Sequence, residues 1–241
     1  MPNIIKYEIK KMISSKITYI CLLLTMLLSA VVSYGFLGMN ADNTLVGVFV
    51  SAIPSAGYDL VLAIMISIFI CEDYSVGVIK MIIGRGYERK EIYFAKCLMV
   101  SLYTVILSLA CVLTGLIVGY MLPFNNKALS AKAISIVLVQ FLVMLVITTM
   151  MVMLAVIIQK KSIAIAVNIL APSIIQLILE IADEYIKGLK FSHYWVAMFM
   201  NELTNDKIAS DRIMEIMVCS VIYIFLFIVI GYMALCKKDL R

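Results

Sequence analysis

The sequence has few of the residues from which soluble enzymes build their sites. Its 241 residues include one histidine, one tryptophan and four prolines, and only 15% are charged. The single histidine, His193, has no cysteine or carboxylate at ligand spacing, so we expect no zinc site. The six cysteines form no CxxC pair, and we expect buried, reduced thiols. The sequence thus predicts neither a metal ligand nor a catalytic residue.

Catalytic and phosphate-binding motifs are also missing. The chain contains no G-x-S-x-G, no H-E-x-x-H and no paired intramembrane aspartates. The stretch GRGYERK lacks the G-x-x-x-x-G-K-[ST] spacing that cradles phosphates. We therefore expect no cofactor to be bound by this chain. If the protein uses ATP, a partner chain binds it, and an intramembrane enzyme is the least favoured function.

Apolar residues, at 64% of the chain, are what the sequence has in abundance. A soluble domain is about half apolar, and a spanning helix needs about 20 consecutive apolar residues. Runs near that length recur along the chain, and Pro54 interrupts the second of them. We predict an all-α integral membrane protein with six transmembrane helices. The predicted spans are residues 17–37, 55–71, 97–122, 133–158, 162–181 and 213–236.

The segments between these spans differ in charge. If the N-terminus is cytoplasmic, 14 of the 20 Lys and Arg residues lie inside and six lie outside. Cytoplasmic loops carry an excess of Lys and Arg, so we expect both termini to be cytoplasmic. The net charge of +5 is then an orientation signal, and we expect no nucleic-acid partner.

Residues 2–15 are amphipathic when drawn as a helix. One half of the wheel is apolar (Ile4, Ile5, Ile9, Met12, Ile13) and the other is basic and polar (Lys6, Tyr7, Lys10, Lys11, Ser14). Such a helix suits the headgroup layer of a membrane. We predict an interfacial helix; a simple basic anchor is the alternative.

The segment between the second and third predicted spans combines charge with helix-like apolar spacing. It predicts a short helix at about residues 76–86, lying across the cytoplasmic mouth. A solvated loop whose charges only set the topology is the alternative. The order of residues favours the helix: Glu72 closes the second span, Gly77 opens the helix, and Ile79 and Lys80 follow. Basic residues at Arg85, Arg89 and Lys96 then lead into the third span.

This order resembles the first cytoplasmic loop of ABC transporter permeases of the type-two exporter family. Here Ala95 replaces the glycine that precedes the lysine in that family, and no proline follows the short helix. The resemblance extends over essentially the whole chain. It includes an N-terminal interfacial helix, six spans, and a part-helical outer segment at 183–212 before the last span. Among subfamilies, the chain is most similar to exporters of bacitracin, lantibiotics and amphipathic toxin peptides.

The resemblance implies a partner and a mechanism. A separate ABC ATPase would bind ATP and Mg and dock at Glu72, Gly77, Ile79, Lys80, Arg85, Arg89 and Lys96. Two permease chains, as a homodimer or with a sibling, would form the pathway in the bacterial plasma membrane. The substrate would be an amphipathic or antimicrobial peptide or a lipid-like molecule. The alternative is a membrane immunity or binding protein that acts without an ATPase.

Polar residues recur every four positions along the fifth predicted span, at Asn168, Pro172, Gln176 and Glu180. This spacing places them along one face of a helix. Polar groups at membrane depth face protein or water. The stripe predicts either a pathway lining or a helix–helix contact. At its outer end, Glu180 with Asp183 and Glu184 would form a negative mouth that favours cationic substrates; acids that are simply solvated at the helix end are the alternative.

Overall fold

A computed structural model describes residues 2–39, 53, 57–121, 131–186, 190–204 and 208–237. These residues form helices, turns and short irregular links, and no strand occurs among them. The elements are α1 (Pro2–Ser14), α2 (Lys16–Met39), α4 (Tyr58–Ser75), α5 (Val78–Gly84), α6 (Arg89–Met121), α7 (Ala131–Ile158), α8 (Lys161–Tyr185), the 3₁₀ helix η1 (Ser192–Tyr194), α9 (Val196–Leu203) and α10 (Ser210–Lys237).

Five of these helices, α2, α6, α7, α8 and α10, are long and apolar enough to cross a membrane. The count becomes six if α4 and α5, which meet at an angle of 59°, form one bent span. The predicted all-helical, multi-pass architecture is confirmed at this level. The observed bounds differ most for α6, which begins at Arg89, whereas we expected the third span to begin at residue 97.

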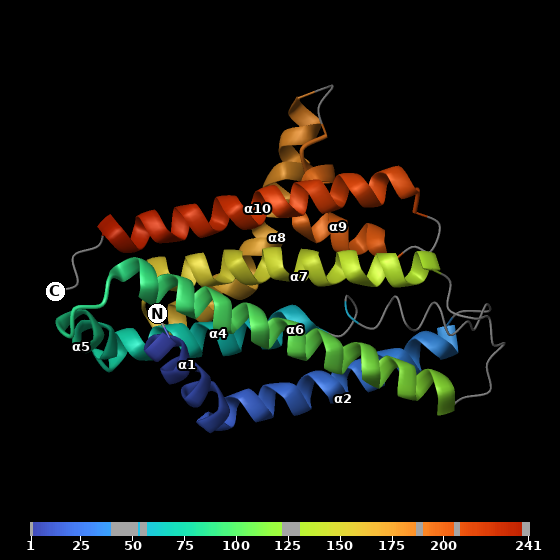
Figure 1. Ribbon diagram of the computed structural model, residues 1–241. Helices are drawn as coiled ribbons and strands as arrows, with labels where there is room; N and C mark the ends of the chain where they lie inside the picture. The colour runs from blue at the N-terminus through green and yellow to red at the C-terminus, as the bar shows by residue number, and fades with distance from the viewer. Residues whose placement is uncertain are drawn as a thin grey trace.

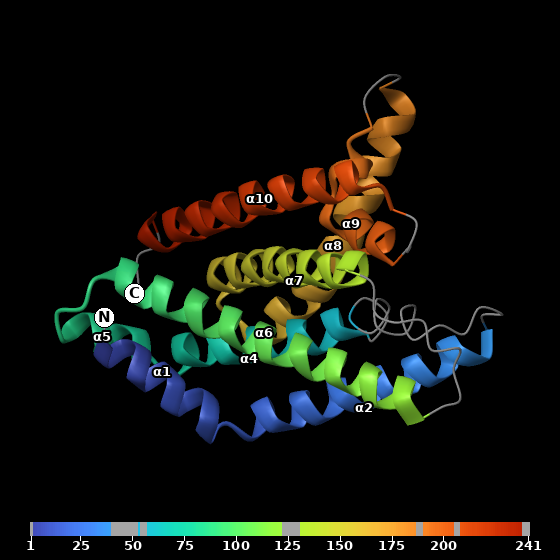
Figure 2. The same cartoon turned by 45° about the vertical axis from the view of Figure 1, so that its right-hand side comes forward.

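The long helices run side by side, with α7 between α10 and the pair formed by α4 and α6 (Figures 1 and 2). The α8 helix crosses behind α7, and its C-terminal part stands clear of the other helices. The buried residues of α8 are Ala164 and Asn168, both in its first half. One end of the bundle gathers α1, α5, the start of α6 and the end of α10, and we call it the α5 end.

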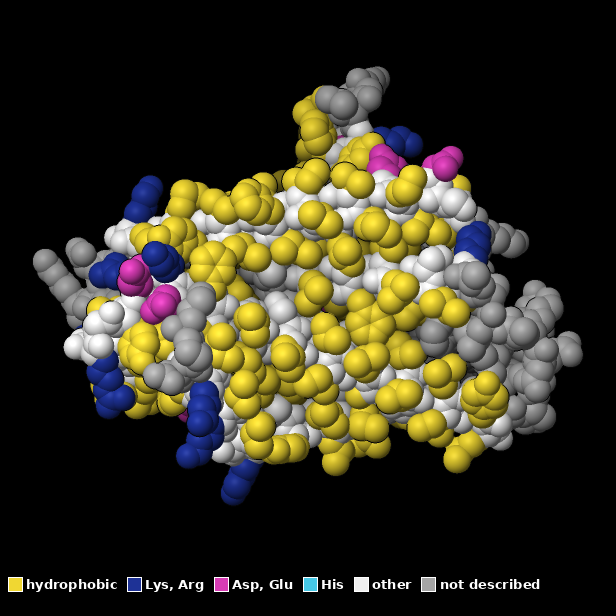
Figure 3. Space-filling model, viewed as in Figure 1, with side chains coloured by type: hydrophobic (Ala, Val, Ile, Leu, Met, Phe, Trp, Pro, Cys, Tyr) yellow, Lys and Arg dark blue, Asp and Glu magenta, His cyan; other side chains and the backbone are white. Residues whose placement is uncertain are grey.

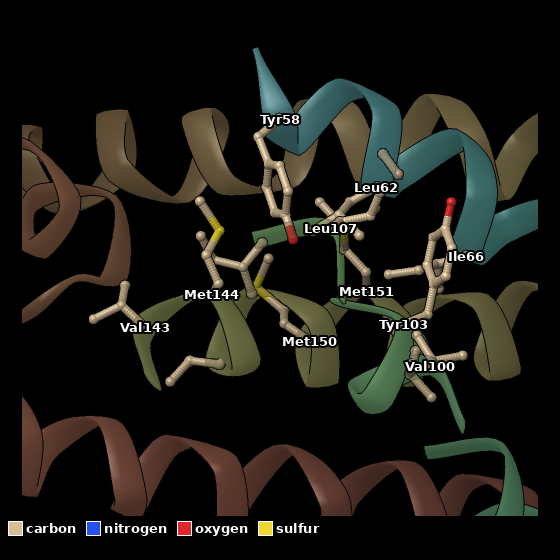
Figure 4. Packing of buried hydrophobic residues seen from close by; sticks show 14 of the residues in the cluster. Tyr58, Leu62, Ile66, Val100, Tyr103, Leu107, Val143, Met144, Met150 and Met151 are labelled. Atoms are coloured by element: carbon tan, nitrogen blue, oxygen red, sulfur yellow. The ribbon is translucent and has the colours of Figure 1, made fainter. Parts of the chain in front are cut away.

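Hydroxyl groups link the long helices inside the apolar core. Tyr58 points from α4 toward α6 (Figure 4), where its hydroxyl donates to the Thr104 carbonyl oxygen at 2.7 Å and lies 2.8 Å from Ser108 Oγ. The Thr104 hydroxyl oxygen, Oγ1, lies 2.9 Å from Thr148 Oγ1 of α7. Such hydrogen bonds hold helices together where apolar packing alone gives little preference over lipid.

The outer surface is apolar over the middle of the bundle, and charged side chains gather toward its ends (Figure 3). On α2, for example, Leu23 and Val31 are more than 60% exposed, and Phe225 on α10 is 71% exposed. Soluble monomers rarely expose apolar patches of this extent. The surface therefore fits a lipid environment.

Candidate functional site

The α5 helix is a short, separate element between two glycines in the left-handed region. Gly77, at φ 76°, precedes it, and Gly86, at φ 87°, follows it. Residues with a Cβ adopt this region with strain, so the two glycines allow the chain to turn sharply at both ends. The sharp turns separate α5 from α4 and from α6 and leave it at the surface of the α5 end.

Opposite faces of α5 have different environments. Ile79 is 2% exposed, while Ile82 and Ile83 pack against a small cluster formed by Ile4, Ile92 and Ala95. Lys80 and Arg85 are exposed, and Met81 is 51% exposed. The apolar face therefore anchors α5 to α1 and α6, and the basic face is open to a partner.

A cavity of about 180 Å³ lies between α1 and α5. Its lining consists of Ile4, Tyr7, Val78, Met81, Ile82, Arg85 and Tyr87. Most of this surface is apolar, and among the described lining residues Arg85 alone carries a full charge. The cavity has the size and character to admit an apolar side chain beside the exposed face of α5.

Beside α5, four charged side chains form a buried charge cluster from three helices: Glu8 and Lys11 of α1, Asp73 of α4 and Lys96 of α6. Lys96 Nζ donates to Glu8 Oε1 at 2.9 Å and to Asp73 Oδ2. Lys11 Nζ lies 2.5 Å from Asp73 Oδ1 and donates to the Phe69 carbonyl oxygen at 2.8 Å. The cluster therefore connects α1, α4 and α6 directly at the α5 end.

The cluster contains two cations and two carboxylates, so its formal charges balance. Burial lowers the pKa of the Lys11 ammonium, nearby Lys96 lowers it further, and Asp73 opposes both effects. Glu8 is fully buried, and its Oε2 atom accepts no hydrogen bond among the described residues. Desolvating four charges is costly, so removing one member leaves the others unbalanced.

The residues predicted to couple to an ATPase fall into three places. Gly77, Lys80 and Arg85 lie at the turn and on the open face of α5, and Ile79 lies on its packing face. Lys96 is inside the buried charge cluster.

The third place consists of two contacts between helices, made by Glu72 and Arg89. The Glu72 carboxylate is 3.7 Å from Lys161 Nζ at the start of α8. Arg89 Nη1 donates to the carbonyl oxygens of Leu235 and Cys236, at 3.4 and 3.1 Å, at the end of α10.

Sequence reasoning missed Glu8 and Asp73 and placed Lys11 on the polar half of α1. A signal for Glu8 was present, because Ile4, Glu8 and Met12 recur every four residues and all three are buried. A carboxylate in a buried i, i+4 row requires a cation from a neighbouring helix. Lys96, already singled out at the head of the third span, is that cation.

The polar stripe of α8 divides between two environments. Asn168 is buried and donates to Ser67 Oγ at 2.9 Å and to the Met151 carbonyl oxygen at 3.3 Å, so it lies in a contact with α4 and α7. Pro172 and Gln176 line a second cavity, toward the far end of the bundle. Gln176 Nε2 donates to Glu180 Oε1 at 2.8 Å, and Glu180 is exposed.

The outer segment between α8 and α10 is tied down by its charged residues. The Asp183 carboxylate accepts from the backbone N–H groups of Phe191 and Ser192, at 2.5 and 2.9 Å. Arg212 Nε lies 2.9 Å from Glu202 Oε2, and its Nη2 donates to the His193 carbonyl oxygen at 2.7 Å. Asp183 therefore joins Phe191 and Ser192 to the end of α8, in addition to contributing negative charge there.

Comparison with known proteins adds a family. None of the curated proteins compared with the chain matches it. Residues 58–241 match the family described as "Protein of unknown function (DUF2705)". This range begins at the first residue of α4 and includes α5, the Asp73 and Lys96 members of the buried charge cluster, and all later helices. The chain belongs to the DUF2705 family.

Proposed function

We propose that the chain is the membrane-spanning permease subunit of an ATP-driven ABC exporter. A separate ATPase chain binds ATP and Mg²⁺ and docks on α5. The observation that carries the proposal is α5 itself: a short helix with a buried apolar face and an exposed basic face that bears Lys80 and Arg85. A loop that only set topology would need no such packing.

The contacts of α5 suit the transmission of force. Movement of α5 passes to α4 through the turn at Gly77 and to α1 and α6 through the Ile4, Ile92 and Ala95 cluster. The buried charge cluster joins the same three helices. ATP-driven closure of the ATPase would therefore tilt several helices as one body, which is a common form of two-state switching.

The proposal places the α5 end in the cytoplasm of a bacterium, with the helices in its plasma membrane. A second permease chain, identical or a sibling, completes the pathway. The apolar residues on the C-terminal part of α8, such as Leu177 and Ile178, are exposed and available to such a chain. The substrate is an amphipathic or antimicrobial peptide or a lipid-like molecule, whose apolar part the surrounding helices can accommodate.

Copurification of the natural ATPase, followed by ATPase measurement in lipid, tests the docking surface. The variant Lys80→Glu/Arg85→Glu reverses two exposed charges on α5 and should abolish both copurification and ATP-dependent transport. The control, Lys237→Glu, reverses an exposed charge at the same end but on α10, and it should behave as wild type. Normal ATPase binding by the double variant would refute docking on α5.

A helix-breaking change tests transmission separately from docking. Met81→Pro removes the backbone N–H that donates to the Gly77 carbonyl oxygen at 3.2 Å and introduces a clash inside α5. We expect ATP hydrolysis to continue while transport is lost. A folded variant that transports at the wild-type rate would exclude the coupling role. Absence of any ATPase from the wild-type preparation would support a membrane immunity or binding protein that acts without one.

A further inference from the structure

A cavity of about 220 Å³ lies between α4, α7, α8 and α9, toward the far end from α5. Its walls are mainly apolar and come from α7 and α9, together with Pro172 of α8. Four lining residues carry a polar or charged group: Asp59, Gln176, Trp195 and Asn201. They come from three helices and from the residue that precedes α9, so only the folded chain brings them together.

Asp59 is the charged member of this set. It is the second residue of α4, an 18-residue helix that spans about 27 Å at 1.5 Å per residue. Because the hydrocarbon core is about 30 Å thick, a carboxylate at this position lies near its outer boundary. The Asp59 side chain is exposed, so its carboxylate is open to a ligand in the cavity. None of the described residues that line the cavity is Lys or Arg, so they supply no counter-ion for Asp59.

The other polar residues are arranged to accept hydrogen bonds. Gln176 uses its amide nitrogen to donate to Glu180, so its carbonyl oxygen is the group that can accept from a ligand. Trp195 Nε1 donates to the Pro172 carbonyl oxygen at 3.1 Å. This bond holds the indole at the cavity wall, where an aromatic ring can attract a cation. Asn201 adds an amide oxygen.

We propose that this cavity binds an organic cation of side-chain size, an ammonium or guanidinium group, with Asp59 as its counter-ion. The volume excludes a whole peptide but fits one basic side chain. The inference rests on the proposed function in one respect: in an exporter, the cation belongs to the transported molecule. The site then recognises a basic residue of an amphipathic substrate, and apolar neighbours such as Met144 and Met150 contact its aliphatic stem.

The chain provides its own reporter, because Trp195 is the only tryptophan. Its fluorescence can be followed in vesicles of zwitterionic lipid, without ATP or a partner chain. The probes are n-butylguanidinium and n-butylurea, which have nearly the same shape and differ in charge. We expect saturable binding of n-butylguanidinium at least tenfold tighter than that of n-butylurea. Equal responses to the two probes, or no saturable response, would overturn the proposal.

Two variants connect the response to the cavity. Asp59→Asn should remove the preference for n-butylguanidinium, whereas Glu184→Gln, which removes an exposed carboxylate from the same end of α8, should retain it. Retained selectivity in Asp59→Asn would refute the assignment. Since no ATPase takes part, failure of this test is distinct from failure of the proposed export function.

Discussion

Lys96 lies among three charged neighbours in a part of the molecule from which water is excluded. Its side chain is 2% exposed and contacts Glu8 and Asp73. Removing one partner of a buried ion pair leaves an uncompensated charge and costs about 3–5 kcal/mol. We expect Lys96→Met to lower the free energy of unfolding by about this amount. Denaturation by SDS in mixed micelles, followed by circular dichroism, measures the change.

A matched control, Lys90, lies six residues before Lys96 at the start of the same helix. Lys90 pairs with Glu88 at 2.6 Å, but both side chains are more than half exposed. Lys90→Met should therefore change stability little, because exposed pairs are screened by water. Adding Glu8→Gln to Lys96→Met leaves the balanced pair Lys11 and Asp73, and it should recover part of the loss. Equal effects of Lys96→Met and Lys90→Met would contradict the importance of the buried charge cluster.

The cluster also shows which residues the sequence could and could not reveal. Lys96 was recognisable from its position in a motif. Of the adjacent acids, the motif pointed to Glu72, yet Asp73 enters the cluster and Glu72 is only half-buried. Neighbouring residues on a helix differ in direction by about 100°. An error of one residue in the assumed rotation of the helix therefore exchanges an inward residue for an outward one. That rotation is set by the neighbouring helices against which the helix packs.

At the scale of elements, α6 and α10 approach each other closely at a glycine, Gly231. A Cβ at Gly231 of α10 would overlap Tyr93 Oη and lie 2.9 Å from Tyr93 Cζ. Tyr93 is 1% exposed and has little space to move. Overpacking of this kind costs about 1–3 kcal/mol. We expect Gly231→Ala to lower the thermal unfolding midpoint in detergent.

Gly35 of α2 is the matched control, because a Cβ there meets nothing within 4 Å. Gly35→Ala should leave the midpoint unchanged or raise it, since alanine favours a helix. Combining Gly231→Ala with Tyr93→Phe removes the overlapping hydroxyl and should restore part of the stability. If Gly231→Ala and Gly35→Ala had the same effect, close packing at Gly231 would be excluded as the cause.

The α1 helix offers a second prediction at this scale. Lys6 and Lys10 are exposed, Met12 is buried against the bundle, and Ile9 is 40% exposed on the apolar side. Cysteines at positions 6 and 10 should react with water-soluble maleimides added from the cytoplasmic side. A cysteine at position 12 should be protected by protein, and one at position 9 by lipid. Uniform labelling at all four positions would exclude an interfacial α1.

Elements were easier to predict than their ends. Each long apolar run corresponds to a helix, because about 20 apolar residues leave few alternatives in a membrane. The start of α6 at Arg89 was not foreseen, since charged residues suggested a loop before residue 97. The helix extends back to Arg89 because Lys96 pairs with Glu8 and Asp73, and because Arg89 donates to carbonyl oxygens at the end of α10. Those partners are distant in sequence, so local patterns could not reveal them.

For the whole molecule, orientation in the membrane is the property that the proposed function requires. The fold brings the exposed Lys6, Lys10, Lys80 and Arg85 to the α5 end, so its positive charge is concentrated on one side. Positively charged flanks stay in the cytoplasm. A cysteine at position 80 should therefore react with an impermeant reagent only in inside-out vesicles, and one at position 184 only in right-side-out vesicles.

Background reactivity in that experiment can be reduced by design. Four of the six native cysteines are buried and Cys219 is half-buried, whereas Cys236 is exposed at the α5 end. Replacing Cys236 with serine should remove most native labelling while leaving the helices in place. In that background, positions 80 and 184 should label from opposite sides. Labelling of both from the same side, or of position 80 from outside, would contradict a cytoplasmic α5 and the docking of an ATPase there.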